Sequence, residues 1–243
     1  MTIENRRVVI TGAARDFGRT LAIAFARLGA EVYLSARSLA GAERTRDEIR
    51  ALGHDRVHAF ACDISSPESV RAFADAVREH TDHVDLLINN GAAWLEGEDL
   101  LSADDEAILA TTGSGATGTV LVTKYFLPLL LASAQPDIVT MVSVCGVPNF
   151  AGSSAHDAFY AAKGAQSAFT GILSKRLRER GVRVISLFPP DFDNIDPLSP
   201  EWETAPRGPE NTLTAQSLVD CITFAVNQPR DCFISAFHFE PAP

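Results

Sequence analysis

Short apolar runs, many of them rich in β-branched residues, alternate along the chain with longer stretches whose apolar residues recur at helical spacing. The short runs are residues 8–10, 32–34, 57–62, 84–88, 138–142, 182–187 and 232–239. The stretches with helical spacing are residues 17–28, 39–52, 66–80, 103–132, 157–180 and 214–227. Such alternation is typical of βαβ units, in which helices cover both faces of a parallel sheet. The pattern therefore predicts a single α/β domain over residues 1–243, with a doubly wound parallel sheet of about seven strands.

Two stretches depart from this regular pattern. Residues 103–132 read as one long helix but contain Gly113, Gly115 and Gly118, each of which costs about 1 kcal/mol relative to alanine inside a helix. These glycines predict either a close backbone approach or a local break. Six of the thirteen prolines lie between residues 188 and 209. Long irregular segments of compact domains are usually lids or binding loops, so we expect residues 188–213 to form a substrate lid within the domain.

Composition narrows the classes of partner. The 243 residues are 46% hydrophobic and 21% charged, which is enough apolar material for one large core. A net charge of −10 disfavours nucleic acid and an anionic membrane as partners. The four cysteines and six histidines show no metal-ligand spacing, so we expect no metal site. We see neither a signal segment nor an apolar run of about 18 residues, and we expect a cytoplasmic protein.

A turn containing two glycines joins the first apolar run to the first helical stretch. Residues 11–18 read TGAARDFG. A turn of this kind presents glycine backbone and free amides at a helix N-terminus, where a pyrophosphate group is readily bound. The segment therefore indicates a nucleotide site, and a purely structural turn is the alternative.

The order of motifs over nearly the whole chain resembles the short-chain dehydrogenase/reductase family, whose members have a Rossmann fold. The family pattern Thr-Gly-x-x-x-Gly-x-Gly matches at Gly12 and Gly18, whereas Asp16 replaces the middle glycine. A carboxylate at this place suits the helix dipole but would repel a bound pyrophosphate. Arg15 is placed in the sequence to offset that charge. The resemblance assigns Arg15, Asp16 and Phe17, with the two glycines, to the phosphate-binding turn.

The end of the second apolar run bears on which dinucleotide is bound. An NAD site usually offers an acidic residue to the ribose 2′-hydroxyl there, but residues 35–38 read SARS. The cations Arg15 and Arg37 instead suggest a 2′-phosphate. We therefore expect NADP(H) rather than NAD(H). A solvated Arg37 with no cofactor contact is the alternative.

The resemblance implies further cofactor contacts along the chain. The residues that it assigns are Asp63, Ile64, Asn89, Asn90, Gly91, Lys163 and Pro189. Asp63 corresponds to the family's adenine contact, with an ordinary loop aspartate as the alternative. The Asn-Asn-Gly-Ala segment that begins at Asn89 corresponds to the family's Asn-Asn-Ala-Gly, which touches the adenosine half and stabilises the sheet. Pro189 lies in the turn that meets the nicotinamide, although Pro190 stands where the family has glycine.

The family's chemistry requires a serine, a lysine and a tyrosine, and the third does not match. Ser143 corresponds to the serine that polarises the reacting oxygen, and Lys163 to the lysine. The tyrosine belongs four residues before the lysine, one helical turn away, but Phe159 stands there and Tyr160 follows it. Either a distorted helix start lets Tyr160 serve, which we slightly prefer, or Phe159 takes the place of the phenol.

Two further features bear on the proton. His156 and Asp157 are reserve donors at the same helix start, for which capping of the helix is the favoured alternative. The family also often has an asparagine in the preceding long helix that orders a water behind the lysine. Residues 113–118 contain no asparagine, and Gly115 occupies the corresponding place.

These observations support two hypotheses of different classes. The first is an NADP(H)-dependent oxidoreductase that transfers hydride between the nicotinamide and a carbonyl or alcohol of a small organic substrate, with Ser143, Tyr160 and Lys163 as catalytic residues. The second is a nucleotide-binding homologue with a degenerate site, which has a regulatory role or a non-redox chemistry. We prefer the first. The resemblance also implies a homodimer or homotetramer that pairs through residues 103–132 and 157–180.

Overall fold

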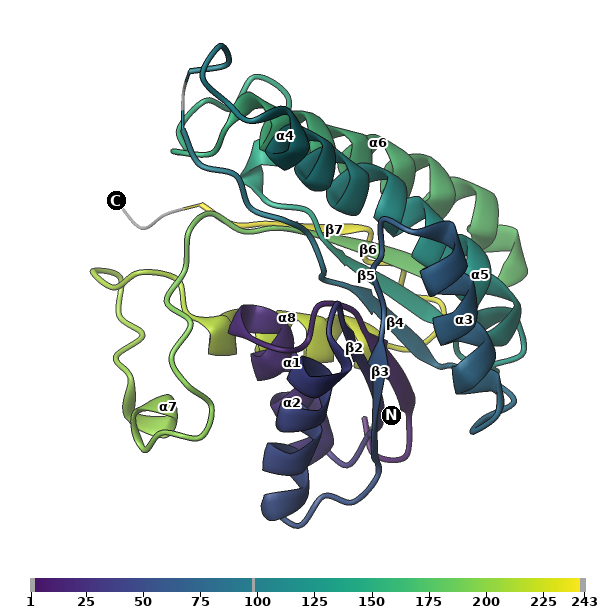
Figure 1. The fold of residues 1–243 in the computed structure, drawn as a ribbon. Helices are drawn as coiled ribbons and strands as arrows, with labels where there is room; N and C mark the ends of the chain where they lie inside the picture. Colours follow the sequence, from purple (N-terminus) through teal and green to yellow (C-terminus); the bar gives the residue numbers. More distant parts are fainter. Residues whose placement is uncertain (1–2, 98, 241–243) are drawn as a thin grey trace.

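The computed structural model describes residues 3–97 and 99–240, which form a parallel sheet covered by helices on both faces (Figure 1). The strands are β1 (Arg7–Ile10), β2 (Glu31–Ala36), β3 (Val57–Ala61), β4 (Leu86–Asn89), β5 (Asp137–Met141), β6 (Arg183–Phe188) and β7 (Ala236–His238). They lie in the order β3-β2-β1-β4-β5-β6-β7, and each pair is parallel. The predicted doubly wound α/β fold is confirmed.

The helices lie in two layers. The elements are α1 (Asp16–Arg27), α2 (Leu39–Ala51), α3 (Pro67–Arg78), α4 (Asp105–Thr112), η1 (Gly113–Gly118), α5 (Thr119–Leu131), η2 (Val144–Gly146), α6 (Asp157–Leu177), η3 (Arg178–Arg180), α7 (Glu201–Thr204) and α8 (Ala215–Asn227). Figure 1 shows α1, α2 and α8 on one face of the sheet and α3, α5 and α6 on the other. The first layer follows from the helical spacing of residues such as Leu21 and Phe25, which are fully buried.

Each strand supplies side chains to both layers. In β1, Val8 and Ile10 belong to the core under α1, α2 and α8, whereas Val9 belongs to the core under α3, α5 and α6. Successive side chains of a strand point to opposite faces, and both faces are covered here. This explains why the strands read as continuous apolar runs rather than as alternating ones.

The stretch 103–132 is broken, as its glycines predict. It consists of α4, a π-helical turn η1 and α5 rather than one α-helix. A Cβ atom on Gly115 would lie 2.8 Å from the Cβ atom of Ala162, and one on Gly118 would lie 2.9 Å from the carbonyl oxygen of Ile64. Both explanations offered from the sequence therefore apply, because the local break coincides with a close approach to α6.

The segment 188–213 begins with the last residue of β6 and is otherwise irregular except for the short helix α7. Its first half is attached to α1: the Thr20 hydroxyl donates to Asn194 Oδ1 at 2.9 Å, and Arg19 donates to Asp196 at 3.0 Å. Its second half returns to the start of α8, where the Asp193 amide donates to the Leu213 carbonyl at 2.8 Å. Figure 1 shows the loop with α7 projecting beyond the helices at the end of the sheet where the C-terminus lies. Its role as a lid stays a prediction.

The opposite end of the sheet carries a buried ion cluster that the sequence did not indicate. Asp137, at the start of β5, is fully buried and accepts hydrogen bonds from Arg6, Arg183 and Arg230. Arg6 and Arg183 also donate to the carbonyl of Val226. The cluster therefore ties the starts of β1, β5 and β6 to the end of α8, and its buried polar groups have partners.

No helix within residues 3–97 and 99–240 is long and apolar enough to span a membrane.

Candidate active site

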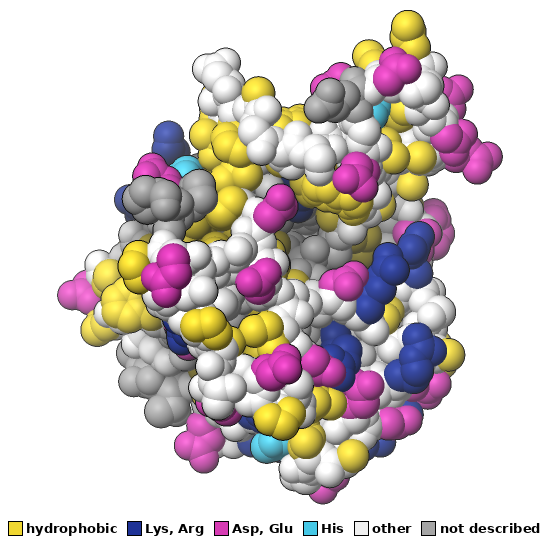
Figure 2. Space-filling model, turned by 90° about the vertical axis from the view of Figure 1, so that its left-hand side faces the viewer, with side chains coloured by type: hydrophobic (Ala, Val, Ile, Leu, Met, Phe, Trp, Pro, Cys, Tyr) yellow, Lys and Arg dark blue, Asp and Glu magenta, His cyan; other side chains and the backbone are white. Residues whose placement is uncertain are grey.

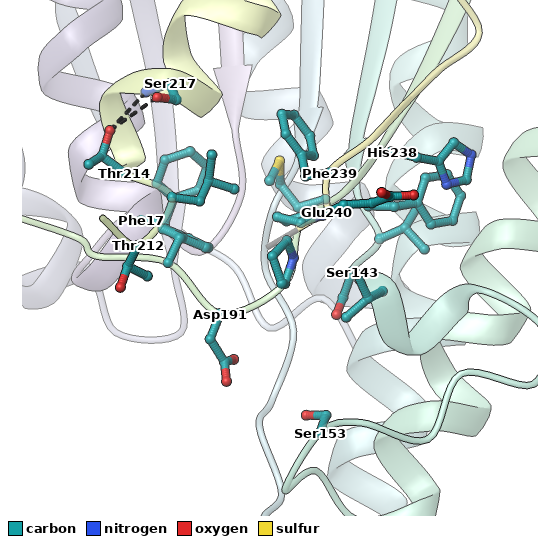
Figure 3. Close-up of a pocket in the computed structure, with 18 of the residues that line it drawn as sticks. Phe17, Ser143, Ser153, Asp191, Thr212, Thr214, Ser217, His238, Phe239 and Glu240 are labelled. Carbon is teal, nitrogen blue, oxygen red and sulfur yellow. Dashed lines mark hydrogen bonds between the residues drawn. The ribbon is translucent and has the colours of Figure 1, made fainter. Parts of the chain in front are cut away.

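A cavity of about 1340 Å³ opens at the carboxyl ends of the strands. It lies where the strand order reverses between β1 and β4, which is the place where open α/β sheets bind their ligands. Figure 2 views this end of the molecule and shows the recess, with hydrophobic side chains along its upper wall and acidic side chains around its mouth. In Figure 3, Ser143, His238 and Glu240 lie on one side of the cavity, and Phe17, Thr212 and Thr214 lie on the other.

Two positions of the turn after β1 require glycine, because a larger residue would not fit at either of them. Gly12 has a positive φ of 70°, and a Cβ atom on it would lie 2.7 Å from the Cα atom of Gly91. A Cβ atom on Gly18 would collide with the carbonyl oxygen of Gly12. Thr11 Oγ1 accepts hydrogen bonds from the amides of Asn90 and Gly91, at 3.1 and 3.0 Å. The segment that begins at Asn89 therefore braces the turn, and of its three assigned residues Asn90 lines the cavity.

The residue that replaces the family's middle glycine keeps a glycine-like backbone. Asp16 has a φ of 50°, in the left-handed region that favours glycine, and begins α1. Its carboxylate lies 3.3 Å from the guanidinium of Arg15, and both side chains are exposed. Phe17 is buried, lines the cavity and packs edge-on against Phe192 of the 188–213 segment. The turn is thus closed by glycine backbone, and an exposed carboxylate stands at the start of α1.

Arg37 follows β2 and Asp63 lies just beyond the neighbouring strand β3, and both are exposed. Ser65 donates to the Asp63 carboxylate from its hydroxyl at 2.6 Å and from its amide at 2.9 Å. These hydrogen bonds lower the pKa of Asp63, and the positive charge of Arg37 adds to the effect. Ile64 is buried and approaches Gly91, since its Cδ1 atom would lie 3.0 Å from a Cβ atom there.

Ser143 and Lys163 both line the cavity. Ser143 follows β5 with a φ of 105°, and its hydroxyl oxygen accepts the Cys145 amide at 3.2 Å. The ammonium group of Lys163 is buried; it donates to the carbonyl of Met141 at 2.7 Å and to Gln166 Oε1 at 3.0 Å. Burial lowers the pKa of Lys163 to about 8. Pro189 adjoins the serine turn, because its carbonyl accepts the Val144 amide at 3.0 Å.

The helix that carries Lys163 starts regularly, so the distorted helix start that would let Tyr160 serve is not observed. α6 begins at Asp157, and Phe159 lies one turn before Lys163 on the side that lines the cavity. The Lys163 ammonium is 5.2 Å from the centre of the Phe159 ring. The Tyr160 hydroxyl instead accepts the Ser153 amide at 3.1 Å and donates to the Ser153 carbonyl at 3.4 Å. No tyrosine is among the described residues that line this cavity.

The remaining sequence-predicted residues have structural partners. His156 caps α6, since its Nδ1 atom accepts the Ala158 amide at 3.1 Å, which agrees with the capping interpretation. Asn89 is buried and donates to Thr123 Oγ1 at 3.1 Å. Sequence reasoning missed Gln166, whose contact with Lys163 depends on helix packing. It also missed two residues that line the cavity, His238 at the end of β7 and Glu240 just after it, because that strand is too short to give a clear pattern.

Comparison with known proteins finds curated relatives that are named as dehydrogenases. Short-chain dehydrogenase/reductase 3 of Homo sapiens is 36% identical over 152 residues, which cover 62% of this chain and 50% of that protein. Epidermal retinol dehydrogenase 2 of Mus musculus is 34% identical over 171 residues, which cover 70% of this chain and 55% of that protein. This chain therefore spans about half the length of these curated relatives.

Solved structures and a family model agree with this placement. A metagenomic short-chain oxidoreductase in complex with NADP has the same fold, with a TM-score of 0.80 at 24% identity over 99% of both chains. The 3-ketoacyl-(acyl-carrier-protein) reductase of Brucella melitensis, complexed with NADH, gives a TM-score of 0.80 at 26% identity over 98% of this chain and 97% of that one. A family model described as short chain dehydrogenase matches residues 6–198. The chain therefore belongs to the short-chain dehydrogenase/reductase family of oxidoreductases.

Proposed function

We propose that this oxidoreductase binds NADP(H) in the cavity and transfers hydride between the nicotinamide and a carbonyl or alcohol group of a small organic substrate. One observation carries the proposal: Ser143 and Lys163, from different elements, line the same cavity beside the Gly12 turn. A hydroxyl and a buried ammonium group next to a phosphate cradle suit a dinucleotide and a carbonyl oxygen together.

The residues present fit a dinucleotide at most points. The space beside Gly12 and Gly18 admits backbone only, and the N-cap residue Arg15 makes no side-chain hydrogen bond to the amides at the start of α1, where a pyrophosphate would bind. Arg37 and Asp63 suit a phosphorylated adenosine, the first by its charge and the second as a hydrogen-bond acceptor. Asp16 alone opposes the fit, because its charge has the same sign as the phosphates.

Hydride transfer is the chemistry that a bound nicotinamide supplies. The chain's own residues would do the rest. The Ser143 hydroxyl donates to the substrate oxygen and stabilises the negative charge that develops there. Lys163 offers its third N–H to a ribose hydroxyl, since its other two are used by Met141 and Gln166.

Proton transfer is the step for which this chain departs from the family, because Phe159 stands where the tyrosine is expected and Tyr160 follows it. Reduction of a carbonyl requires one proton on the oxygen, and Phe159 has none to give. We propose that Tyr160 supplies it, which requires its hydroxyl to give up its two hydrogen bonds to Ser153 and its side chain to turn into the cavity that it does not line. Breaking those bonds costs free energy, so we expect turnover to be slow. The test of the proposed function is consumption of NADPH with a panel of aldehydes and ketones; tight binding of NADPH without consumption would favour the degenerate-site alternative.

Arg37→Asp is expected to reverse the preference between dinucleotides. A carboxylate would repel the 2′-phosphate of NADPH and accept a hydrogen bond from the ribose 2′-hydroxyl of NADH. We expect the ratio of the two dissociation constants to change by about tenfold or more, which corresponds to one charge-assisted contact. Fluorescence titration with NADPH and NADH measures both constants. Arg176→Asp is the matched control, because Arg176 is exposed in the last turn of α6, and an equal effect of the two variants would contradict the assignment of Arg37.

A further inference from the structure

A seam of buried polar groups joins α6 to the broken helix that precedes it. Gly115 and Thr119 are four residues apart on η1 and α5, and Ala162 and Gln166 are four residues apart on α6. Residues four apart lie on one face of a helix. The missing side chain of Gly115 lets the two helices approach at Ala162, where a Cβ atom would leave only 2.8 Å. One turn further along, Thr119 and Gln166 therefore come within hydrogen-bonding distance.

The Gln166 amide has a partner on each side. Gln166 is 2% exposed and Thr119 is also 2% exposed. The Gln166 Nε2 atom donates to Thr119 Oγ1 at 2.7 Å, and Gln166 Oε1 accepts from the Lys163 ammonium at 3.0 Å. The Thr119 hydroxyl uses its own hydrogen on the carbonyl of Gly115 at 2.7 Å. Because that hydroxyl has one hydrogen to donate, Gln166 must present its nitrogen to Thr119 and its oxygen to Lys163.

This arrangement determines the surroundings of a buried cation. An ammonium group has three hydrogens and no lone pair, and a buried charge is costly unless acceptors surround it. The Met141 carbonyl and Gln166 Oε1 accept two of the hydrogens. The Phe159 ring lies at 5.2 Å and offers its negative face. Among the described residues, Gln166 is therefore the side chain that accepts a hydrogen bond from this ammonium, and the Met141 carbonyl is the backbone acceptor.

We infer that Gln166 is a positioning residue, which holds the ammonium of Lys163 in its charged form and in one orientation because Thr119 locks its amide. What the ammonium then does for a ribose rests on the proposed function, whereas the contacts do not. The asparagine that the family often places behind this lysine is replaced here by Gly115. The link from the lysine to the broken helix is thus made by a side chain of α6.

The groups that accept hydrogen bonds from the Lys163 ammonium are neutral. The Cys145 side chain of η2 is the titratable group that faces the ammonium closely enough to act on it. From β5 the contact is the Met141 carbonyl, and from α5 it is the Thr119 hydroxyl, reached through Gln166. On α6 itself, the nearby Tyr160 hydroxyl is bonded to Ser153. Burial works against the charge, and removing the oxygen of Gln166 strengthens that effect.

The chain allows a direct measurement, because Lys124, Lys163 and Lys175 are its three lysines. Full-length protein labelled with [ε-13C]lysine gives few side-chain resonances, and Lys163→Arg assigns the one of interest. Its chemical shift is followed against pH in the wild type, Gln166→Met, Gln166→Glu and Thr119→Val. Thr123→Val is the matched control: Thr123 lies one turn after Thr119 on the same face but bonds Asn89 instead.

The two substitutions at Gln166 are expected to act in opposite directions. Gln166→Met removes an acceptor and should lower the titration midpoint of Lys163 by about one pH unit, and Gln166→Glu adds an anion and should raise it by about one unit. Thr119→Val should lower it by a smaller amount, because Gln166 loses its anchor. Thr123→Val should leave the midpoint of Lys163 unchanged. The midpoints of Lys124 and Lys175 should be the same in every variant. Loss of packing alone cannot produce shifts of opposite sign.

Two results would overturn the inference: an unchanged midpoint in both Gln166 variants, or a shift of the same sign in both. If the Gln166 variants do not fold, the comparison of Thr119→Val with Thr123→Val decides, and equal midpoints would reject it. NADPH titration at several pH values gives the functional readout, in which Gln166→Met should lose affinity at lower pH than the wild type does. Failure of the wild type to bind NADPH would reject the proposed function and leave the lysine titration a valid test of Gln166.

Discussion

Phe159→Tyr is expected to raise the rate of NADPH-dependent carbonyl reduction about 100-fold, because it places a proton donor inside the cavity, where Tyr160 does not lie. Phe159 lies one turn before Lys163 and lines the cavity with Ser143. The ammonium is 5.2 Å from the ring centre, so a phenol there would have its pKa lowered from about 10 toward neutrality. General acid catalysis by a positioned side chain typically contributes about 10²–10⁴-fold. Steady-state kinetics at saturating NADPH measures the gain.

The controls separate a proton donor from a mere increase in polarity. Phe150 is a second ring that lines the cavity, and Phe150→Tyr is expected to leave the rate within about twofold. Tyr160→Phe should abolish most of the slow wild-type rate but have little effect in the Phe159→Tyr background, where the new phenol replaces it. An unchanged rate in Phe159→Tyr would show that the proton is not limiting, and full activity of Tyr160→Phe would remove Tyr160 from the mechanism.

Asp16→Gly is expected to tighten NADPH binding about tenfold. The carboxylate of Asp16 lies at the start of α1, where the phosphates would bind. Like charges about 4 Å apart repel by about 1 kcal/mol in water and about 4 kcal/mol near a protein surface. Since about 1.4 kcal/mol is tenfold in affinity, the expected gain is at the low end of this range. The φ of 50° at Asp16 suits glycine, so the substitution should not disturb the turn. Fluorescence titration with NADPH measures the change.

Asp16→Asn distinguishes charge from backbone strain. Asparagine keeps the size of the side chain and tolerates a positive φ, but it carries no charge. If repulsion limits binding, both variants gain affinity, and the gain shrinks at high salt because the wild type is then screened. A gain with glycine and none with asparagine would assign the effect to strain. No gain in either variant would contradict the placement of the phosphates beside Asp16.

The alternation of apolar runs and helical stretches was enough to predict the sheet and its helices. It was enough because each parallel strand is buried on both faces and each helix has one apolar face, so that burial is visible in the local sequence. The same reasoning predicted the break at Gly113 to Gly118 but not its form, a π-helical turn. The last apolar run, 232–239, yields a strand only at Ala236–His238.

Contacts between residues distant in the sequence were not predictable in this way. Arg6, Asp137 and Arg183 meet only because β1, β5 and β6 start at the same end of the sheet. The bond between Gln166 and Thr119 depends on how closely two helices approach, which Gly115 alone does not specify. Helical periodicity did show that Phe159 shares a face with Lys163. The regular start of α6 and the hydrogen bond of the Tyr160 hydroxyl with Ser153 depend on how the preceding loop folds, which periodicity does not specify.

The central claim, that hydride passes between a nicotinamide and a carbonyl carbon in this cavity, is tested most directly by following the hydride itself. NADPH carrying deuterium at C4, in each of its two stereochemical forms, is incubated with the wild type and a carbonyl compound that it consumes, and with Phe159→Tyr. We expect mass spectrometry to find one deuterium on the carbinol carbon of the product, from one of the two forms. The claim is contradicted if both proteins bind NADPH and neither transfers deuterium from either form to any carbonyl compound of the panel.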